Sequence, residues 1–241
     1  MLQLDRGSFH TCHVSIVELA SEAIGLVDVV AGLGESRRVI LGITGPPGSG
    51  KSALAQSLVV EINFLQGEPF ARTVPADGYH LYNKRLDELG IRRYKGAPHT
   101  FDVAAYVAKL QELRDSGMKP AWCPRYDRHV IHDPVENAIE IPADTRIVIT
   151  EGNYLLLDDC GWGDVRQLLD DVWYVDVSKE PVEPRLLSRH HKSGNDEATA
   201  RWRVRENDLV NFDLVESCRA RANRFVEQTE FEPLATNSAD P

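Results

Sequence analysis

The chain has 241 residues, which is enough to bury a full hydrophobic core in one domain, and a formal net charge of −10. This acidic balance argues against a nucleic-acid-binding protein that works through a basic face, and no apolar run reaches the length of a membrane span. The four cysteines are far apart and form no CxxC pair, so the composition favours a cytoplasmic protein with reduced thiols over a disulfide framework or a zinc site.

The first predicted element is a helix over about residues 14–33. Apolar residues such as Ile16 and Leu19 recur at helical spacing, and Gly32 marks the end of the pattern. We interpret residues 1–36 as a helical lead-in to the first strand.

An apolar strand over Val39–Ile43 follows and runs into a glycine-rich turn. The segment GPPGSGKS matches the pattern G-x-x-x-x-G-K-[ST] in full, and an Ala/Leu-rich helix over 53–65 comes next. In this pattern the glycines bring backbone N–H groups close to an anion, the lysine reaches the β- and γ-phosphates, and the serine hydroxyl ligates Mg²⁺. A chance Gly/Pro-rich turn is the alternative, but the strand before it and the helix after it favour a nucleoside triphosphate site. The predicted nucleotide-binding residues here are Gly45, Pro46, Pro47, Gly48, Ser49, Gly50, Lys51, Ser52 and Ala53.

A second short strand, RTVPAD, ends at Asp77. The stretch over 78–101 is too polar for the core and too long for a simple turn, and loops of that kind are usually functional or disordered. FDVAAYVAKLQELRDSG is predicted to be an amphipathic helix with Asp102 near its start and Gly117 at its end. Residues 120–142 are rich in turn-forming residues and favour a short strand plus a hairpin.

Two further apolar strands are predicted over 146–152 and 172–177, and the arginine-rich segment after them is typical of two helices broken at Gly194. Strands that alternate with helices indicate a doubly wound parallel sheet, in which ligands bind at the carboxyl ends of the strands. Those ends carry the glycine-rich turn, Asp77, Glu151 and Asp176. Residues 232–241 have little to bury and are expected to form a flexible tail.

Several classes of triphosphate-binding protein do not fit this sequence. The NKxD motif with which GTPases read guanine is absent, because the nearest match, NKRLD, has one residue too many, and the LSGGQ signature of ABC-type ATPases is also absent. The strand that ends in Glu151 lacks the Asp-Glu pair of ATPases that activate water. One acidic residue at each of two strand ends, with arginines downstream, favours phosphoryl transfer to a bound hydroxyl, in which a carboxylate accepts the alcohol proton.

Five segments in this order and spacing, GITGPPGSGKS, ADGYHLYN, RYKGAPHTFDV, PRYDR and ITEGNYLLL, resemble the phosphoribulokinase/uridine kinase/pantothenate kinase group of P-loop small-molecule kinases. The resemblance spans about residues 39–225. It implies an α/β P-loop NTPase fold, with a doubly wound, mostly parallel five-stranded sheet, helices on both faces and a helical lid. It also implies a kinase domain over 37–231 with its lid at about 180–207, and ATP and Mg²⁺ as cofactors.

The resemblance implies how the acceptor is bound and activated. Asp77 matches the acidic residue of a DGFH-like motif and is implied to be the base for the acceptor hydroxyl. Glu151 is implied to hold Mg²⁺ together with Ser52, either directly or through water. The implied acceptor-binding residues are Asp77, Tyr79, His80, Lys95, Arg125 and Tyr154.

The resemblance also implies which residues neutralise and enclose the nucleotide. Arg185 and Arg189 match lid arginines that act on the transferring phosphoryl group, together with Lys51 of the P-loop. Asn207 and Asn211 fall where the family closes over the nucleotide base.

Simpler roles remain open for several of these residues. Asp77 could cap the turn after its strand, and the lid arginines could form a solvated helix face. The pairs His129/His132 and His190/His191 invite a metal site, but no cysteine or carboxylate cluster completes the geometry that zinc requires.

The acceptor is less specified than the chemistry. DGYH and KGAPHTFD are closer to the pantothenate kinase pattern, whereas PRYDR departs from it. We therefore predict a Mg²⁺-dependent kinase that moves the γ-phosphoryl group of ATP to a hydroxyl of a small polar metabolite, with a nucleoside or sugar-type acceptor favoured. Pantothenate kinase-like activity, a non-catalytic nucleotide-binding switch and a scaffold with a decayed site are the alternatives. The expected partners are the small-molecule acceptor and, because dimers are the commonest oligomers, a second copy of the chain; neither nucleic acid nor a membrane is expected.

Overall fold

The computed structural model describes residues 15–128 and 130–227. The first 14 residues of the predicted lead-in, His129 and the predicted tail over 232–241 lie outside the described residues. Within the described part of the chain, no helix is both long and apolar enough to cross a membrane.

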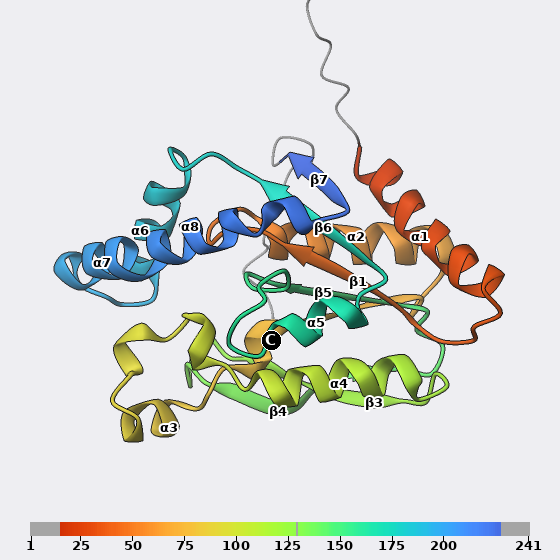
Figure 1. Cartoon of the computed structure of the whole chain (residues 1–241), viewed down its shortest axis with the longest axis horizontal. Coiled ribbons are helices and arrows are strands. Elements are labelled where there is room, and N and C mark those ends of the chain that lie inside the picture. Colours follow the sequence, from red (N-terminus) through yellow and green to blue (C-terminus); the bar gives the residue numbers. More distant parts are fainter. Residues whose placement is uncertain (1–14, 129, 228–241) are drawn as a thin grey trace, which may run out of the picture.

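A five-stranded parallel sheet forms the centre of the molecule, in the order β2-β5-β1-β6-β7 (Figure 1). All residues of β1 and β5 are buried, which explains why their sequences are continuous apolar runs without alternation. The four predicted strands of this sheet are confirmed, but the second ends at Pro75, before Asp77, which lies in a 3₁₀ turn. The sequence does not predict β7, because only one of its four residues is buried. The strands are β1 (Val39–Thr44), β2 (Ala71–Pro75), β5 (Ile147–Gly152), β6 (Asp171–Asp176) and β7 (Arg224–Glu227).

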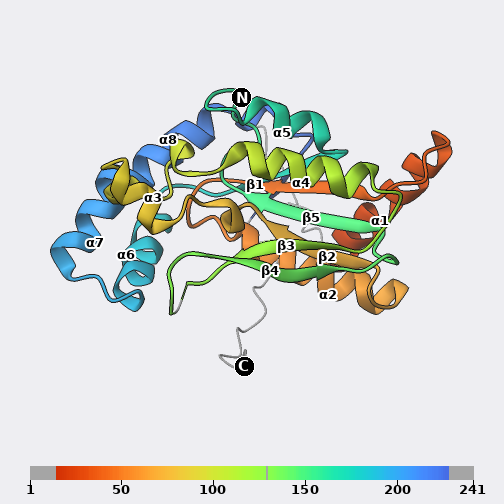
Figure 2. The same cartoon turned by 90° about the horizontal axis from the view of Figure 1, so that it is seen from below.

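Helices cover both faces of the sheet, as expected for a doubly wound fold. Alternate residues of β1 point to opposite faces: Leu41 packs with α1 (Ile16–Gly32) and α2 (Lys51–Gln66), whereas Ile40 packs in the cluster on the other face. Figure 2 shows α4 and α5 above the sheet and α2 below it. The helices that contribute to the hydrophobic cluster around Ile40 are α4 (Val103–Asp115), α5 (Gly163–Leu168) and α8 (Leu209–Ser217).

Local capping explains where two predicted helices begin. Ser15 and Glu18 form a capping box at the start of α1, in which each side chain accepts a hydrogen bond from the other residue's backbone N–H. Asp102 caps α4 by accepting from the N–H of Ala105. Both helices confirm the elements expected from the spacing of apolar residues.

The polar stretch over 78–101 is ordered into short helical turns. They are η1 (Ala76–Tyr79), α3 (Asn83–Glu88), η2 (Arg92–Tyr94) and η3 (Pro98–Thr100). The predicted hairpin follows α4 and consists of two antiparallel strands, β3 (Ala121–Tyr126) and β4 (Pro134–Ile141), in a separate two-stranded sheet. The hairpin packs against η1, so it supports the turn that follows β2.

The arginine-rich segment forms two helices at the end of the molecule where α3 also lies (Figure 1). They are α6 (Val182–Lys192) and α7 (Glu197–Arg203), and the predicted break at Gly194 is confirmed by a left-handed backbone there, with φ of 81°. A short π-helix, η4 (Val204–Asp208), connects α7 to α8, and the 3₁₀ turn η5 (Arg219–Arg221) precedes β7. Single π-turns of this kind occur frequently at functional sites. We refer to α6, α7 and η4 as the lid.

Candidate active site

The glycine-rich turn joins the buried end of β1 to the start of α2. Gly45, Gly48 and Gly50 have φ values of 153°, 79° and 95°, a region that residues with side chains rarely adopt. A Cβ at Gly45 would lie 2.9 Å from the carbonyl oxygen of Val175, so packing against β6 also requires glycine. The buried Ser49 hydroxyl has no hydrogen-bond partner among the described residues. The turn thus presents backbone groups at the N-terminus of α2, an arrangement suited to phosphate.

Lys51 is the first residue of α2 and is buried beside the turn. Its Nζ lies 3.4 Å from the carbonyl oxygen of Pro46, to which it donates. Burial lowers the pKa of Lys51, and the negative charges of Glu151 and Asp77 oppose that shift. Phosphate oxygens held at the turn would add negative charge and favour the protonated ammonium.

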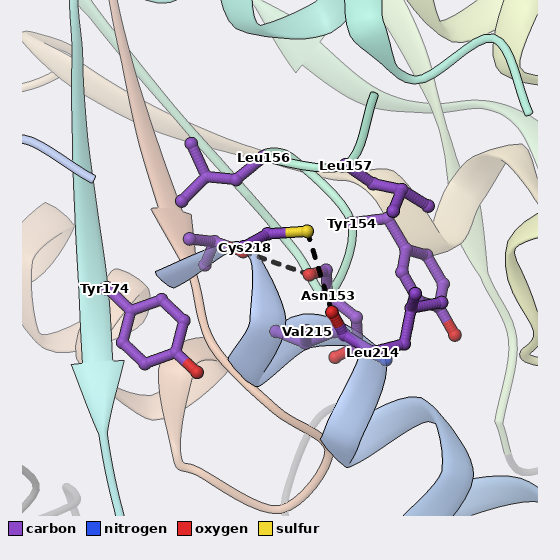
Figure 3. Close-up of a pocket in the computed structure, with 9 residues that line it drawn as sticks. Asn153, Tyr154, Leu156, Leu157, Tyr174, Leu214, Val215 and Cys218 are labelled. Carbon is purple, nitrogen blue, oxygen red and sulfur yellow. Dashed lines mark hydrogen bonds between the residues drawn. The ribbon is translucent and has the colours of Figure 1, made fainter. Parts of the chain in front are cut away.

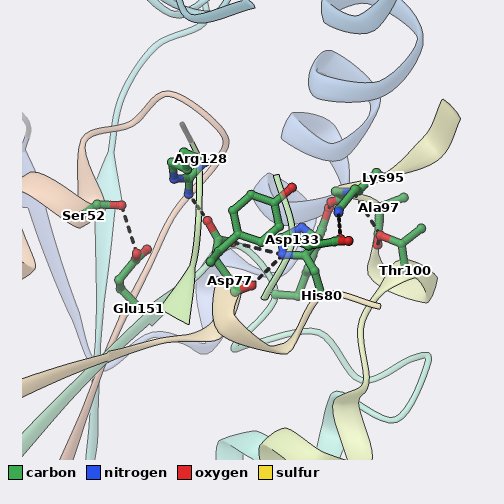
Figure 4. A network of polar contacts seen from close by, with 12 residues as sticks. Ser52, Asp77, His80, Lys95, Ala97, Thr100, Arg128, Asp133 and Glu151 are labelled. Carbon is green, nitrogen blue, oxygen red and sulfur yellow. Dashed lines mark hydrogen bonds and ion pairs between the residues drawn. The ribbon is translucent and has the colours of Figure 1, made fainter. Parts of the chain in front are cut away.

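Glu151 faces the start of α2 from the neighbouring strand. The register of β5 against β1 puts Glu151 opposite Ile43, directly before the turn. Ser52 donates from Oγ to Oε1 of Glu151 at 3.0 Å (Figure 4). The pKa of Glu151 is raised, because its carboxylate is buried and because Asp77 lies nearby.

The hydroxyl of Ser52 and the carboxylate of Glu151 fit Mg²⁺. Within the described residues, no group of three or more His, Cys, Asp or Glu side chains could hold a metal ion. Mg²⁺ typically takes one or two protein ligands and completes its shell with waters and substrate phosphates, which this oxygen pair allows. A bound cation would also favour the ionised form of Glu151 and oppose the effects of burial and of Asp77 on its pKa.

Asp77 lies just beyond the end of β2, in the turn η1. Because β2 pairs with β5, Asp77 and Glu151 lie at the same edge of the sheet. The Asp77 carboxylate forms an ion pair with Arg128, from the loop after β3 (Figure 4). Burial alone would raise the pKa of Asp77, but the charge of Arg128, with smaller contributions from the neighbouring His80, Lys51 and Arg189, outweighs it and lowers the pKa to about 2. Asp77 is therefore ionised at neutral pH.

His80 connects Asp77 to an aromatic wall. Its Nδ1 donates to the carbonyl oxygen of Asp77 at 2.8 Å, and its ring packs on Phe101 and Tyr126, with centroid distances of 3.9 and 5.0 Å. Burial lowers the pKa of His80, so the neutral imidazole is favoured at neutral pH. In that form Nε2 is a hydrogen-bond acceptor.

Lys95 ties three segments together on the same side as His80. Its Nζ donates to Oδ1 of Asn83 at 2.6 Å, to the carbonyl oxygen of His132 at 2.9 Å and to Oδ1 of Asp133 at 2.9 Å. These bonds engage all three protons of the ammonium group. Burial lowers the pKa of Lys95, and its hydrogen bond to Asp133 opposes the shift. Lys95 thus joins η2 to α3 and to the hairpin loop.

The lid contributes polar side chains from two of its helices. In η4, Asp208 accepts a hydrogen bond from Nε2 of His190 at 2.6 Å and pairs with Arg189 at 3.4 Å. The neighbouring Asn207 donates to the carbonyl oxygen of Lys95 at 3.1 Å. The lid is therefore held to the loop that carries Lys95.

All these groups surround one cavity of about 420 Å³, between the glycine-rich turn, the turn after β2, the hairpin loop and the lid. Ten of the predicted site residues line it: Pro47, Lys51, Ser52, Asp77, His80, Lys95, Glu151, Arg189, Asn207 and Asn211. The structure therefore brings together a glycine-rich turn suited to phosphate, a pair of oxygen ligands suited to Mg²⁺ and a separate ionised carboxylate.

Two residues predicted to bind the acceptor are packed away from this cavity. Tyr79 belongs to the hydrophobic core, where its ring lies 5.0 Å from that of Tyr106 and its buried hydroxyl has no partner among the described residues. Tyr154 donates to the carbonyl oxygen of Gly96 at 2.5 Å and lines a small, mainly apolar pocket beside Cys218 (Figure 3). Both rings are amphipathic, and burial of the apolar body decides their position.

Two predicted arginines also lie outside the cavity. Arg125 is exposed on β3 and is not among the lining residues. Arg185 borders a separate recess on α6 together with Arg189 and Lys192. Asp176, at the end of β6, pairs with Arg219 and does not line the cavity.

Sequence reasoning missed Arg128, Asp208 and Arg203, which all line the cavity. Arg128 lies three residues beyond Arg125, in the loop after β3, so only the point at which that strand ends would have distinguished the two. Asp208 follows Asn207 directly, and an acid at the end of an arginine-rich helix was a usable signal.

No protein-family model matches the chain. The chain is 36% identical over 194 residues to the uncharacterized protein YggC of Escherichia coli K12, covering 80% of this chain and 79% of that protein. It is 32% identical over 212 residues to a Schizosaccharomyces pombe protein named "Putative uridine kinase C227.14", covering 86% of this chain and 90% of that one. A solved structure described as a "putative fructose transport system kinase" from Silicibacter sp. TM1040 superposes with a TM-score of 0.75 at 32% identity, over 86% of this chain and 98% of that chain.

Proposed function

The chain belongs to the phosphoribulokinase/uridine kinase-like family of P-loop kinases, and we propose that it transfers the γ-phosphoryl group of ATP to a hydroxyl of a small nucleoside or sugar-type metabolite. The observation that carries the proposal is the position of Asp77. This ionised carboxylate lines the same cavity as the phosphate-binding turn and as the Ser52–Glu151 pair. A base opposite a triphosphate site is what transfer to an alcohol requires.

The proposed step balances with the residues present. The acceptor oxygen forms a bond to the γ-phosphorus while the bond between that phosphorus and the β–γ bridging oxygen breaks, and the electron pair leaves with ADP. Asp77 accepts the proton of the acceptor hydroxyl. The barrier is lowered mainly by positioning and by neutralising charge on the phosphoryl oxygens.

Positive charge for this step comes from three sides of the cavity. Lys51 lies at the glycine-rich turn, Arg189 lies on α6, and Arg128 lies in the loop after β3. Mg²⁺, held by Ser52 and Glu151, would supply further neutralisation when bound with the nucleotide.

The acceptor class is inferred from the relatives and from the lining of the cavity. Relatives named as a uridine kinase and as a fructose transport system kinase both suggest a polyhydroxylated acceptor. The polar lining of His80, Asn83, Asn153 and Asn207 suits such a molecule. Pantothenate kinase-like activity and a non-catalytic nucleotide switch are the remaining alternatives.

The test is acceptor-dependent ADP release by the purified protein with ATP and Mg²⁺. The panel comprises uridine, cytidine, pantothenate, fructose, ribulose 5-phosphate, glycerate and nicotinamide riboside, with Lys51→Ala as the inactive control. ADP release that depends on one acceptor supports the kinase proposal and identifies the acceptor. Binding of ATP without turnover on any acceptor would favour the nucleotide switch.

A further inference from the structure

The cavity is strongly basic in an otherwise acidic protein. The whole chain carries a net charge of −10, yet only three acidic residues line the cavity, namely Asp77, Glu151 and Asp208. Six basic residues line it: Lys51, Arg92, Lys95, Arg128, Arg189 and Arg203. A local excess of positive charge in a cleft attracts anionic ligands. The nucleotide phosphates account for the part of this excess that lies near the glycine-rich turn.

A second group of charged residues surrounds Lys95, beyond His80 as seen from the glycine-rich turn. His80 packs on Tyr126, and Nζ of Lys95 lies over the same tyrosine ring, 4.8 Å from its centroid. The charges that influence the pKa of Lys51 are those of Glu151, Asp77, Arg189 and Arg128. The charges that influence the pKa of Lys95 are those of Asp133, Arg92 and Arg203. Arg92 lies in η2, directly before Lys95, and Arg203 follows Trp202, whose ring packs on Tyr94 of η2. Arg92 and Arg203 therefore lie at the Lys95 side of the cavity, which we call the acceptor side.

Arg203 is the cation on this side whose charge is not neutralised. Lys95 pairs with Asp133 at 2.9 Å, and Arg92 pairs with Asp87 at 2.7 Å. The structure gives Arg203 no hydrogen bond or ion pair with another described residue. Since Arg203 lines the cavity, a ligand is the available source of an anionic partner.

The position of Arg203 is fixed by contacts on both sides of it. Trp202 packs on Tyr94, next to Lys95, with ring centroids 6.4 Å apart. Four residues after Arg203, Asn207 donates to the carbonyl oxygen of Lys95 at 3.1 Å. These contacts hold the lid against η2, which carries Arg92. The two arginines are thus held at the same end of the cavity without the help of a ligand.

We propose that the acceptor carries an anionic group, a carboxylate or a phosphate, in addition to its reactive hydroxyl, and that Arg203, assisted by Arg92, binds this group. The inference rests on the proposed kinase function and narrows its substrate class to sugar phosphates or sugar acids over neutral sugars and nucleosides. The planar guanidinium donates two parallel hydrogen bonds to either oxyanion. With the anionic group held there, the rest of the acceptor extends past His80 towards Asp77.

The test compares the binding of matched compounds in the presence of ADP and Mg²⁺, by calorimetry on the full chain. The pairs are ribose 5-phosphate with ribose, for a phosphate, and glycerate with glycerol, for a carboxylate. Wild type, Arg203→Gln and Arg205→Gln are compared, because Arg205 is exposed in η4, directly after the end of α7 that carries Arg203, and does not line the cavity. Equal unfolding midpoints of the three proteins exclude misfolding as the cause of any difference.

We expect an anionic member to bind at least about tenfold tighter than its neutral partner, and Arg203→Gln to weaken it by about 10- to 100-fold. Arg205→Gln should bind like wild type, and the affinity for ADP should stay constant in all three. Equal binding of neutral and anionic members, or no binding of any anionic member, would overturn the proposal, as would undiminished binding by Arg203→Gln. Transfer of phosphate to a neutral compound alone would overturn this inference but leave the kinase function standing. Arg203-dependent binding of an anionic compound without any phosphoryl transfer would overturn the kinase function but leave the anion-binding role of Arg203 standing.

Discussion

The ion pair between Asp77 and Arg128 controls how strong a base Asp77 can be. A carboxylate with a pKa of about 2 is fully ionised but is a weak base, and the largest opposing charge comes from Arg128. The Arg128 side chain is 52% exposed, so it has room to turn from Asp77 to the phosphoryl oxygens when an acceptor hydroxyl occupies the carboxylate. This movement of Arg128 would make Asp77 a stronger base and would at the same time place the positive charge of Arg128 on the transferring phosphoryl group.

Replacing Arg128 with glutamine should raise the pKa of Asp77, because burial is then opposed by the weaker effects of His80, Lys51 and Arg189. The base must be ionised, so activity is lost as pH falls through its pKa. In wild type this loss from Asp77 occurs near pH 2, whereas in Arg128→Gln it should move to higher pH. The measurement is kcat/KM against pH from 4 to 8.

Loss of the Arg128 charge should also lower the free energy of unfolding, in a way that depends on pH. The lowered pKa of Asp77 contributes stability that is present above its ordinary value of 3.8 and is lost as pH falls towards 2. Arg128→Gln should therefore be less stable than wild type at neutral pH, with the difference shrinking below pH 4. Arg125→Gln is the matched comparison, since that side chain is exposed and outside the cavity. If the pH profile of kcat/KM shifts in Arg125→Gln but not in Arg128→Gln, Arg125 and not Arg128 acts at the site, as the sequence predicts.

The turn after β2 packs so closely on β3 that it has no room for a side chain at Gly78. Gly78 follows Asp77 directly, and a Cβ at Gly78 would lie 2.4 Å from the carbonyl oxygen of Pro124 in β3. A contact of a side chain with backbone at that distance forces the turn and the hairpin apart. The position of the Asp77 carboxylate thus depends on the close approach of η1 and β3.

Gly78→Ala should therefore destabilise the protein by about 1–3 kcal/mol and lower kcat by about tenfold or more. Gly25→Ala is the control, since Gly25 lies within α1 and its Cβ would meet nothing within 4 Å. That variant should be stabilised by about 0.5–1 kcal/mol with unchanged kcat. Urea unfolding and steady-state kinetics measure both effects. A Gly78→Ala protein as stable and active as wild type would show that the turn can relax.

Elements whose signal is local were predictable from the sequence, and contacts between distant elements were not. The strand–turn–helix over 39–66 was readable because an apolar run, glycines with special backbone angles and Lys51 are contiguous. The choice of Arg128 over Arg125, and the convergence of Arg203 with Lys95, depend on how the hairpin and the lid pack against η1 and η2. No periodicity in a single chain encodes that packing.

The whole molecule assembles its cavity from segments far apart in sequence, from the glycine-rich turn to the lid. A nucleotide that contacts these segments together should stabilise the folded state by mass action, by about 2.7 kcal/mol at 100 times its dissociation constant. We expect ATP with Mg²⁺ to raise the unfolding midpoint by about 5–10 °C. Lys51→Ala should lose most of this shift, measured by scanning calorimetry relative to each protein without nucleotide. An equal shift in the variant would remove Lys51 from the nucleotide site.

The most direct test of the proposed chemistry is to identify the phosphorylated product by ³¹P NMR, with wild type and Asp77→Asn, ATP, Mg²⁺ and the acceptor panel. Asparagine keeps the size of Asp77 but cannot accept the proton. We predict a phosphomonoester signal on one acceptor for wild type, and a rate reduced by about a hundredfold or more for Asp77→Asn, with ATP binding retained. Formation of inorganic phosphate alone, or an undiminished rate in Asp77→Asn, would contradict the assignment of Asp77 as the base of a kinase.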